Sequence, residues 1–251
     1  MNQRQQKSLD MYKDVARILE DHGIEFYAAC GTLIGAVRHH GFIPWDWDID
    51  LYIKEKDLET VNEILKENLD SKKYYYHIPT ADTNPHVFFK EGDFEDLLKR
   101  KEAVYMDLFV LCDYPTSKMR RVIVRSMIFI LSWCDATLID KIKNMKIHNA
   151  LTIIPIIAKK IAKDVASSES DKYIVFSTNY YLNIFPKCCF DDRILIGFED
   201  VEMPIPNGYD TILKTRYGNY MVPPKDSNEK KPAGYPTSVY KDYRKNQDST
   251  R

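Results

Sequence analysis

Three aspartates alternate with other residues in the segment WDWDIDL at 45–51. Asp46, Asp48 and Asp50 are two residues apart, and the side chains of a β-strand also repeat with a period of two. We therefore expect a strand at about 47–53 with all three carboxylates on one face. Its other face would bury the residues between them, which are Trp47, Ile49 and Leu51. Because carboxylates gathered on one face repel each other, we expect Mg²⁺ or Mn²⁺, which prefer hard oxygen ligands, among their oxygens.

A glycine and a threonine open a short predicted helix just upstream, in the sequence GTLIGAVR at 31–38. The N-terminus of a helix attracts phosphate, because its first N–H groups are unpaired and carry the positive end of the helix dipole. Gly31 lets backbone amides approach a donor phosphate, and Thr32 can add a hydroxyl donor. Arg38 can grip a phosphate with its guanidinium or form a surface ion pair, and both interpretations stay open.

A further carboxylate, Asp107, lies in the apolar segment YMDLFVL at 105–111. A lone carboxylate between Met106 and Leu108 needs a partner. Placed beside the first strand it would be a third metal ligand, and the alternative is a strand-end aspartate that caps a turn. We favour the ligand.

These residues fit the transfer of a phosphorus group, which needs charge on the phosphate oxygens neutralised and the attacking hydroxyl held in line. Two Mg²⁺ ions held by shared carboxylates can do both. Asp48 and Asp50 supply the close pair, and Asp107 completes the set and can act as general base. Asp46 is a candidate outer ligand or acceptor-positioning group.

Three histidines near these motifs are interpreted as structural. His39 and His40 follow the predicted helix and are expected to be cap or surface residues rather than phosphate ligands. His86 lies on a predicted strand and is assigned no chemical role.

The elements that position these residues follow from hydrophobic periodicity. We expect helices at 8–22, 32–38, 56–68 and 209–217, and strands at 24–29, 47–53, 74–78, 86–90 and 103–111. This order fits a small α/β core with a mixed sheet.

The segment 118–165 has a different pattern. Its apolar run at 122–130 is interrupted by Arg125 and is too short to span a membrane. Isoleucines and lysines at 153–165 have helical spacing, and we favour a helical cap on the core over a helix lying on an anionic membrane. The polar tail from Tyr240 is expected to be disordered.

Composition excludes several classes of protein. The 251 residues fit one large domain or a core with an appended segment, and 44% hydrophobic content supports a packed core. A net charge of −1 argues against general nucleic-acid binding. Five cysteines without a paired CxxC set, and no signal-peptide pattern at the N-terminus, favour the cytoplasm.

The sequence resembles the LicD/fukutin family of nucleotidyltransferase-fold enzymes. The resemblance rests on GTLIGAVRHHGFIPWDWDIDLYI at 31–53, and extends to YMDLFVLCDYP at 105–115 and more loosely to PIPNGYDTILKTRYGNYMVPP at 204–224. It implies an α/β (α+β) fold with a nucleotidyltransferase-like mixed β-sheet core flanked by helices and a mainly helical C-terminal portion. Residues 1–115 would form the catalytic core, and 116–251 a helical cap and C-terminal segment that completes the cleft in one compact unit.

The resemblance also implies an activity. A LicD-type phosphotransferase moves a phospho-alcohol group from a CDP-linked donor to a hydroxyl of a cell-surface glycan, with Mg²⁺, and releases CMP. CDP-choline is the first choice of donor, and CDP-ribitol and CDP-glycerol are close competitors. The implied acceptors are sugars of teichoic acid, capsule or other surface glycans, often on a lipid carrier. The protein would then work in the cytoplasm, with peripheral contact at the inner face of the membrane.

Two positions depart from the family pattern. Most members have three consecutive aspartates, whereas Trp47 interrupts the row here and would point away from the metal face. Members often carry histidine after the Pro-Pro segment, whereas this chain has KKPAG at 230–234. Details of donor and acceptor binding in that region therefore stay open.

Two other functions compete with this one. A GT-A glycosyltransferase also binds a sugar nucleotide through Asp-x-Asp and Mn²⁺, but its motif follows a longer nucleotide-binding half, whereas here the motif arrives by Asp48. A non-catalytic glycan-assembly module of the same fold is the other, and the intact Asp48, Asp50 and Asp107 argue against it.

Overall fold

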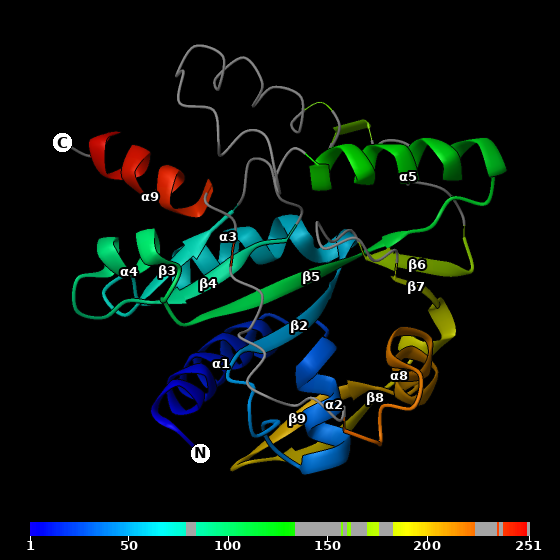
Figure 1. Cartoon of the computed structure of the whole chain (residues 1–251), viewed down its shortest axis with the longest axis horizontal. Helices are drawn as coiled ribbons and strands as arrows, with labels where there is room; N and C mark the ends of the chain where they lie inside the picture. Colours follow the sequence, from blue (N-terminus) through cyan, green and yellow to red (C-terminus); the bar gives the residue numbers. More distant parts are fainter. Residues whose placement is uncertain are drawn as a thin grey trace.

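The computed structural model describes residues 1–78, 84–133, 157, 160–161, 170–175, 183–223, 235 and 238–249. Within these residues seven strands form one mixed sheet in the order β1-β2-β5-β4-β3, and β6 and β7 extend it from the last residues of β5 (Figure 1). The strands are β1 (Phe26–Ala28), β2 (Ile49–Lys54), β3 (Tyr74–His77), β4 (His86–Phe89), β5 (Tyr105–Asp113), β6 (Lys172–Val175) and β7 (Asn183–Pro186). β2 and β5 run parallel, and the other pairs are antiparallel.

Two helices, α1 (Gln3–Asp21) and α3 (Leu58–Asn68), cover one face of this sheet. The hydroxyl of Tyr74 donates to Asp14 of α1, and that of Tyr76 donates to Asn62 of α3, both at 2.7 Å. Because these tyrosines are two residues apart on β3, both helices lie on the same face. The strand register places apolar residues of β2, β4 and β5 on this face, including Ile49, Leu51, Val87, Met106 and Leu108.

The opposite face of the sheet is left for the remaining elements. Helix α2 (Cys30–His39) contacts β2 and the hairpin of β8 (Arg193–Phe198) and β9 (Val201–Pro206). Helix α8 (Tyr209–Tyr217) lies beside α2, as Figure 1 shows. The short helix η3 (Lys187–Phe190) places Phe190 against Tyr52 of β2, with ring centroids 5.8 Å apart.

The mixed α/β fold expected from the sequence is confirmed, and most predicted elements have nearly the predicted bounds. α8 ends before Gly218, whose φ of 64° lies in the left-handed region that favours glycine at a helix end. Strands β6 and β7 come from the predicted second segment, 116–251, and complete the sheet of the first.

The strand predicted at 47–53 begins later, so the expectation of three carboxylates on one strand face is wrong. Of the three, Asp50 lies within β2, and Asp46 and Asp48 precede it. Backbone groups before the strand have other partners. The N–H of Asp46 donates to the carbonyl of Ile43 at 2.9 Å, and its carbonyl accepts the side-chain amide of Gln5 at 2.8 Å.

The apolar side of the motif is largely as expected. Ile49 and Leu51 are fully buried. Trp47 was expected to be buried as well, but it is half-buried, because it lies before the strand. Its ring packs edge-on against Tyr105 at 5.7 Å and lies under the guanidinium of Arg4 at 5.1 Å.

The C-terminal tail is a helix in the structure, so the expectation of disorder from Tyr240 is wrong. Helix α9 (Ser238–Ser249) packs Tyr243 edge-on against Phe94 of α4 (Phe94–Arg100) and against Tyr75, with centroids 5.3 Å and 5.1 Å apart. Aromatic residues within an otherwise polar tail supply this contact. Helix α4 was not predicted from the sequence.

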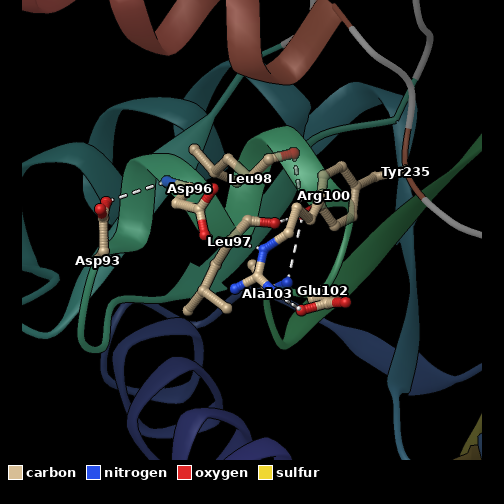
Figure 2. A network of polar contacts seen from close by, with 8 residues as sticks. All are labelled: Asp93, Asp96, Leu97, Leu98, Arg100, Glu102, Ala103 and Tyr235. Atoms are coloured by element: carbon tan, nitrogen blue, oxygen red, sulfur yellow. Dashed lines mark hydrogen bonds and ion pairs between the residues drawn. The ribbon is translucent and has the colours of Figure 1, made fainter.

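Tyr235 anchors the tail just before α9, as Figure 2 shows. Its hydroxyl donates to the carbonyl of Leu97 at 3.1 Å and accepts from the N–H of Ala103 at 3.3 Å. The tyrosine therefore joins α4 to the residues that lead into β5, beside the region where α9 packs.

Helix α5 (Lys118–Trp133) contains the apolar run at 122–130. Among the described helices, α5 included, none has the length and apolar character that a membrane span requires. Most of the predicted helix at 153–165 lies outside the described residues, which include only Ile157, Lys160 and Ile161 of it. The segment 230–234 also lies outside them.

Candidate active site

Asp50 and Asp107 are direct neighbours across the parallel strands β2 and β5. The register puts both side chains on the face opposite α1 and α3. Asp50 is only 8% exposed, and its Oδ1 is a buried oxygen with no hydrogen-bond partner. A buried carboxylate oxygen in this state fits a position beside a cation.

Asp46 and Asp48 join this pair from the segment before β2. Burial raises the pKa of Asp48 well above its usual range, and the charges of Asp50, Asp46 and Asp107 raise it further. Burial likewise raises the pKa of Asp50, followed by the charges of Asp107 and Asp46. The four predicted carboxylates are thus close enough to repel one another, although only two of them lie on strands.

The donor set at this site consists of carboxylate oxygens, which suit Mg²⁺ or Mn²⁺ better than softer metals. Within the part of the chain that is described, no three acidic, histidine or cysteine side chains already converge as ligands around one point. Asp46 Oδ1 accepts a hydrogen bond from the backbone N–H of Trp47 at 3.2 Å, and Asp107 Oδ1 is hydrogen-bonded to Nδ1 of His86. The buried, unpartnered Oδ1 of Asp50 and the mutual repulsion fit a hard divalent cation held by Asp48, Asp50 and Asp107.

The N-terminus of α2 lies against these carboxylates. The buried Thr32 accepts a hydrogen bond at its Oγ1 from the backbone N–H of Asp50 at 2.9 Å. A Cβ on Gly31 would lie 2.4 Å from Asp46 Oδ2, so the missing side chain gives room to that carboxylate. The N-cap, Ala29, has no side-chain hydrogen bond to the first turn of α2.

Backbone strain marks the start of α2. Cys30 has a φ of 48°, in the left-handed region, which costs a residue with a side chain about 1–3 kcal/mol. Its buried thiol lies beside Asp50 and lowers the pKa of that carboxyl by hydrogen bonding. Strain of this kind is common where a backbone is held for binding or catalysis.

Arg38 lies at the other end of α2, about 9 Å along the helix axis from Thr32 at 1.5 Å per residue. Its Nη1 donates to the main-chain carbonyl of Tyr220, and its Nε donates to Nδ1 of His39 at 3.3 Å. Neither contact is the surface ion pair considered from the sequence, and the interpretation of Arg38 as a phosphate-binding residue stays a prediction. His40 is the C-cap of α2, as the cap interpretation predicts.

Arg216 is a site residue that sequence reasoning missed. It comes from the last turn of α8, and its charge lowers the pKa of Asp50. Its Nη1 is buried without a hydrogen-bond partner. The positive charge of Arg216 within the segment TRYGNYM was the available signal for a site residue. Its position beside β2, however, depends on how α8 packs.

The segment that carries these carboxylates also matches known proteins. Residues 23–127 match a family model described as LicD/FKTN/FKRP, nucleotidyltransferase domain, and the matched range includes Asp46, Asp48, Asp50 and Asp107. The chain is 26% identical over 241 residues to the lipopolysaccharide cholinephosphotransferase LicD of Haemophilus influenzae, which covers 85% of this chain and 88% of that protein.

Shorter matches lie in other relatives. The chain is 38% identical over 98 residues to an uncharacterized protein of Rickettsia typhi, covering 36% of this chain and 32% of that protein. It is 38% identical over 50 residues to the ribitol 5-phosphate transferase FKRP of Mus musculus, covering 20% of this chain and 10% of that protein. These comparisons confirm the resemblance to the LicD/fukutin family and the prediction of an enzyme of the phosphotransferase class.

Proposed function

We propose that this protein transfers phosphocholine from CDP-choline to a hydroxyl group of a cell-surface glycan and releases CMP, with Mg²⁺ held by Asp48, Asp50 and Asp107. The observation that carries the proposal is the pairing of Asp50 with Asp107 beside the N-terminus of α2. A cation held by this pair would lie next to the backbone N–H groups at the start of α2, which suit a phosphate.

The residues divide the work of the reaction between them. A cation bound at the carboxylates would supply neutralisation of the phosphate charge and alignment of the reacting groups. Arg216 and the first N–H groups of α2 bind the phosphates of the donor and offset the charge of the departing CMP. Asp107 takes the proton of the glycan hydroxyl. At the same time the hydroxyl oxygen forms a bond to the phosphorus of the phospho-alcohol group, and the bond between that phosphorus and CMP breaks.

Phosphocholine is favoured over other phospho-alcohols by the extent of the matches. The relative named a cholinephosphotransferase aligns with 85% of this chain, whereas the ribitol 5-phosphate transferase aligns with 20%. Ribitol phosphate from CDP-ribitol and glycerol phosphate from CDP-glycerol are the competing substrates.

The test is an assay of the purified protein with Mg²⁺, a glycan fraction and each of CDP-choline, CDP-ribitol and CDP-glycerol. We expect acceptor-dependent release of CMP with CDP-choline, together with a glycan mass increased by one phosphocholine. Asp50→Asn should abolish both signals, and Glu67→Gln, an exposed residue of α3, should change neither. Turnover of UDP-sugars without CMP release from any CDP-alcohol would instead establish the glycosyltransferase.

We also propose that the acceptor is carried on a lipid at the cytoplasmic face of the membrane, where the protein binds peripherally. Helix α5 supports this location, because Met119, Val122 and Phe129 are exposed large apolar residues on the same helix as the exposed Arg125. Such a combination suits the surface of an anionic bilayer. Sedimentation with anionic but not with neutral vesicles, weakened by Val122→Asp, tests this location.

A further inference from the structure

Two histidines on neighbouring strands extend a row of side chains across the sheet from Asp107. His86 of β4 is the direct cross-strand partner of Asp107, and His77 of β3 is the partner of His86. Since paired residues project on the same side, these three side chains and Asp50 form one row on the face that carries the site.

A short hydrogen bond joins the first two members of this row. Nδ1 of His86 lies 2.5 Å from Oδ1 of Asp107. A carboxylate oxygen can only accept here, so Nδ1 carries the proton and donates it. The side chains are 4% and 19% exposed, so little water competes with the bond, and a charge-assisted bond in such surroundings is strong.

The ring of His86 is itself held in place. His77 stacks on it with centroids 5.6 Å apart and planes 10° apart. Nε2 of His77 lies 3.0 Å from Oδ2 of Asp242, which belongs to α9. The aromatic contacts of Tyr243 fix α9 on α4 and β3, and the hydrogen bonds of Tyr235 fix that tyrosine on α4.

We propose that His86 is a positioning residue for Asp107, and that Asp242 of α9 supports His86 by holding the stacked ring of His77. The hydrogen bond engages one oxygen of Asp107 and thereby sets how the carboxylate faces Asp50. The C-terminal helix therefore contributes to the geometry of the site through His77. The interpretation of His86 as merely structural is replaced by this role.

The arrangement differs from what a structural role alone would require. Apolar side chains of similar volume would pack this face of the sheet at lower cost than two buried histidines and two carboxylates. Partners that orient the ligands of a metal typically change metal affinity by about 10- to 100-fold when removed. The inference rests on the proposed function, since it takes Asp107 to be a cation ligand.

The experiment measures binding of Mn²⁺ alone to the full chain, by electron paramagnetic resonance, without any donor or acceptor. His86→Leu removes the donor, whereas His86→Asn keeps an N–H donor near the position of Nδ1. We expect His86→Leu to weaken Mn²⁺ binding by about 10- to 100-fold and His86→Asn by about threefold or less. Asp107→Asn gives the reference for a lost ligand.

The contribution of α9 is tested in the same way. Asp242→Ala should weaken Mn²⁺ binding by about threefold to tenfold, within the lower range of such effects. Tyr240→Phe on the same helix, which removes only a 3.3 Å contact to Glu95, should leave it unchanged. A far-downfield imidazole proton in the NMR spectrum should disappear in His86→Asn and shift in Asp242→Ala, independently of folding stability.

The outcomes separate the two proposals. Mn²⁺ binding that is equal in wild type and His86→Leu would overturn the positioning role, whichever donor the protein uses. Mn²⁺ binding that depends on His86, in a protein that releases no CMP from any CDP-alcohol, would support the positioning role and overturn the proposed function. A wild-type chain that binds no Mn²⁺ would overturn the positioning role.

Discussion

The hydroxyl oxygen of Thr32 accepts a hydrogen bond from the backbone N–H of Asp50 at 2.9 Å, across eighteen positions of the chain. This bond fastens the first turn of α2 to the strand that carries the central carboxylate. The Gly-Thr turn and the aspartate row are therefore one structural unit. A phosphate held at the helix and a cation held at the strand would keep a fixed separation.

Thr32→Val should destabilise the protein by about 1–3 kcal/mol, because it leaves the buried N–H of Asp50 without an acceptor. Thr32→Ser keeps the hydroxyl and should recover most of the loss. Thr215→Val, which removes an exposed hydroxyl bonded to the carbonyl of Thr211, is the matched control and should cost little. Equal denaturant midpoints for Thr32→Val and Thr32→Ser would show that the bond does not matter for stability.

Asp50→Asn should stabilise the metal-free protein above neutral pH and abolish stabilisation by Mg²⁺. Burial and the charges of Asp107 and Asp46 raise the pKa of Asp50, so the folded state binds more protons than the unfolded state. Stability of the metal-free wild type therefore falls as pH rises from the unfolded pKa, about 4, through the raised folded pKa. The neutral amide removes this loss together with a cation ligand.

Thermal unfolding at pH 5 and pH 8, with and without Mg²⁺, checks this linkage. The wild type should gain Tm on addition of Mg²⁺ at pH 8, where the carboxylates are ionised, and gain less at pH 5. Asp50→Asn should show a smaller difference in Tm between the two pH values and no response to the cation. A variant that still gains Tm with Mg²⁺ would exclude Asp50 as a ligand.

Gly31→Ala should leave stability within about 1 kcal/mol of wild type and yet lower activity. The new Cβ would lie 2.4 Å from Oδ2 of Asp46, but that atom ends a short side chain that can rotate away. Alanine is also the better helix former, which offsets part of the cost. The expected damage is therefore displacement of Asp46 from the carboxylate cluster.

A double-mutant cycle with Asp46→Ala isolates that displacement. If Asp46 mediates the effect, Gly31→Ala should add little to the loss of CMP release caused by Asp46→Ala. Additive losses would instead place the role of Gly31 at the backbone, where its amide would contact the donor phosphate.

The carboxylate cluster itself was predictable because its members are either close in sequence or on strands with clear apolar flanks. Asp107 between Met106 and Leu108 marks a buried strand with one polar position, and its pairing with Asp50 follows from the parallel order of β2 and β5. The position of Asp46 and Asp48 was not predictable from alternation. Hydrogen bonds from the backbone of Asp46 to the distant Gln5 and to the nearby Ile43 decide where the strand begins.

The residues that sequence reasoning missed are brought to the site by tertiary packing. His86 acquires its role from an antiparallel register with β5, which no local pattern specifies. Asp242 and Arg216 reach the sheet only because aromatic contacts dock α9 and because α8 packs beside α2. The polar composition of the tail concealed the spacing of Tyr235, Val239 and Tyr243 that anchors it.

Arg216→Ala should weaken use of the CDP-linked donor by about 10- to 100-fold in kcat/KM, the range expected for a lost charge-assisted hydrogen bond of about 1.5–3 kcal/mol. The guanidinium lowers the pKa of Asp50 and has a buried Nη1 without a hydrogen-bond partner, so an anionic donor bound beside the carboxylates would gain a positive charge from it. Arg216→Lys keeps the charge but loses the planar fork and should retain part of the activity. Lys214→Ala, an exposed residue of the same helix paired with Asp210, should behave as wild type. Steady-state CMP release at varied CDP-choline measures the effect, and a variant with unchanged kcat/KM would remove Arg216 from the donor site.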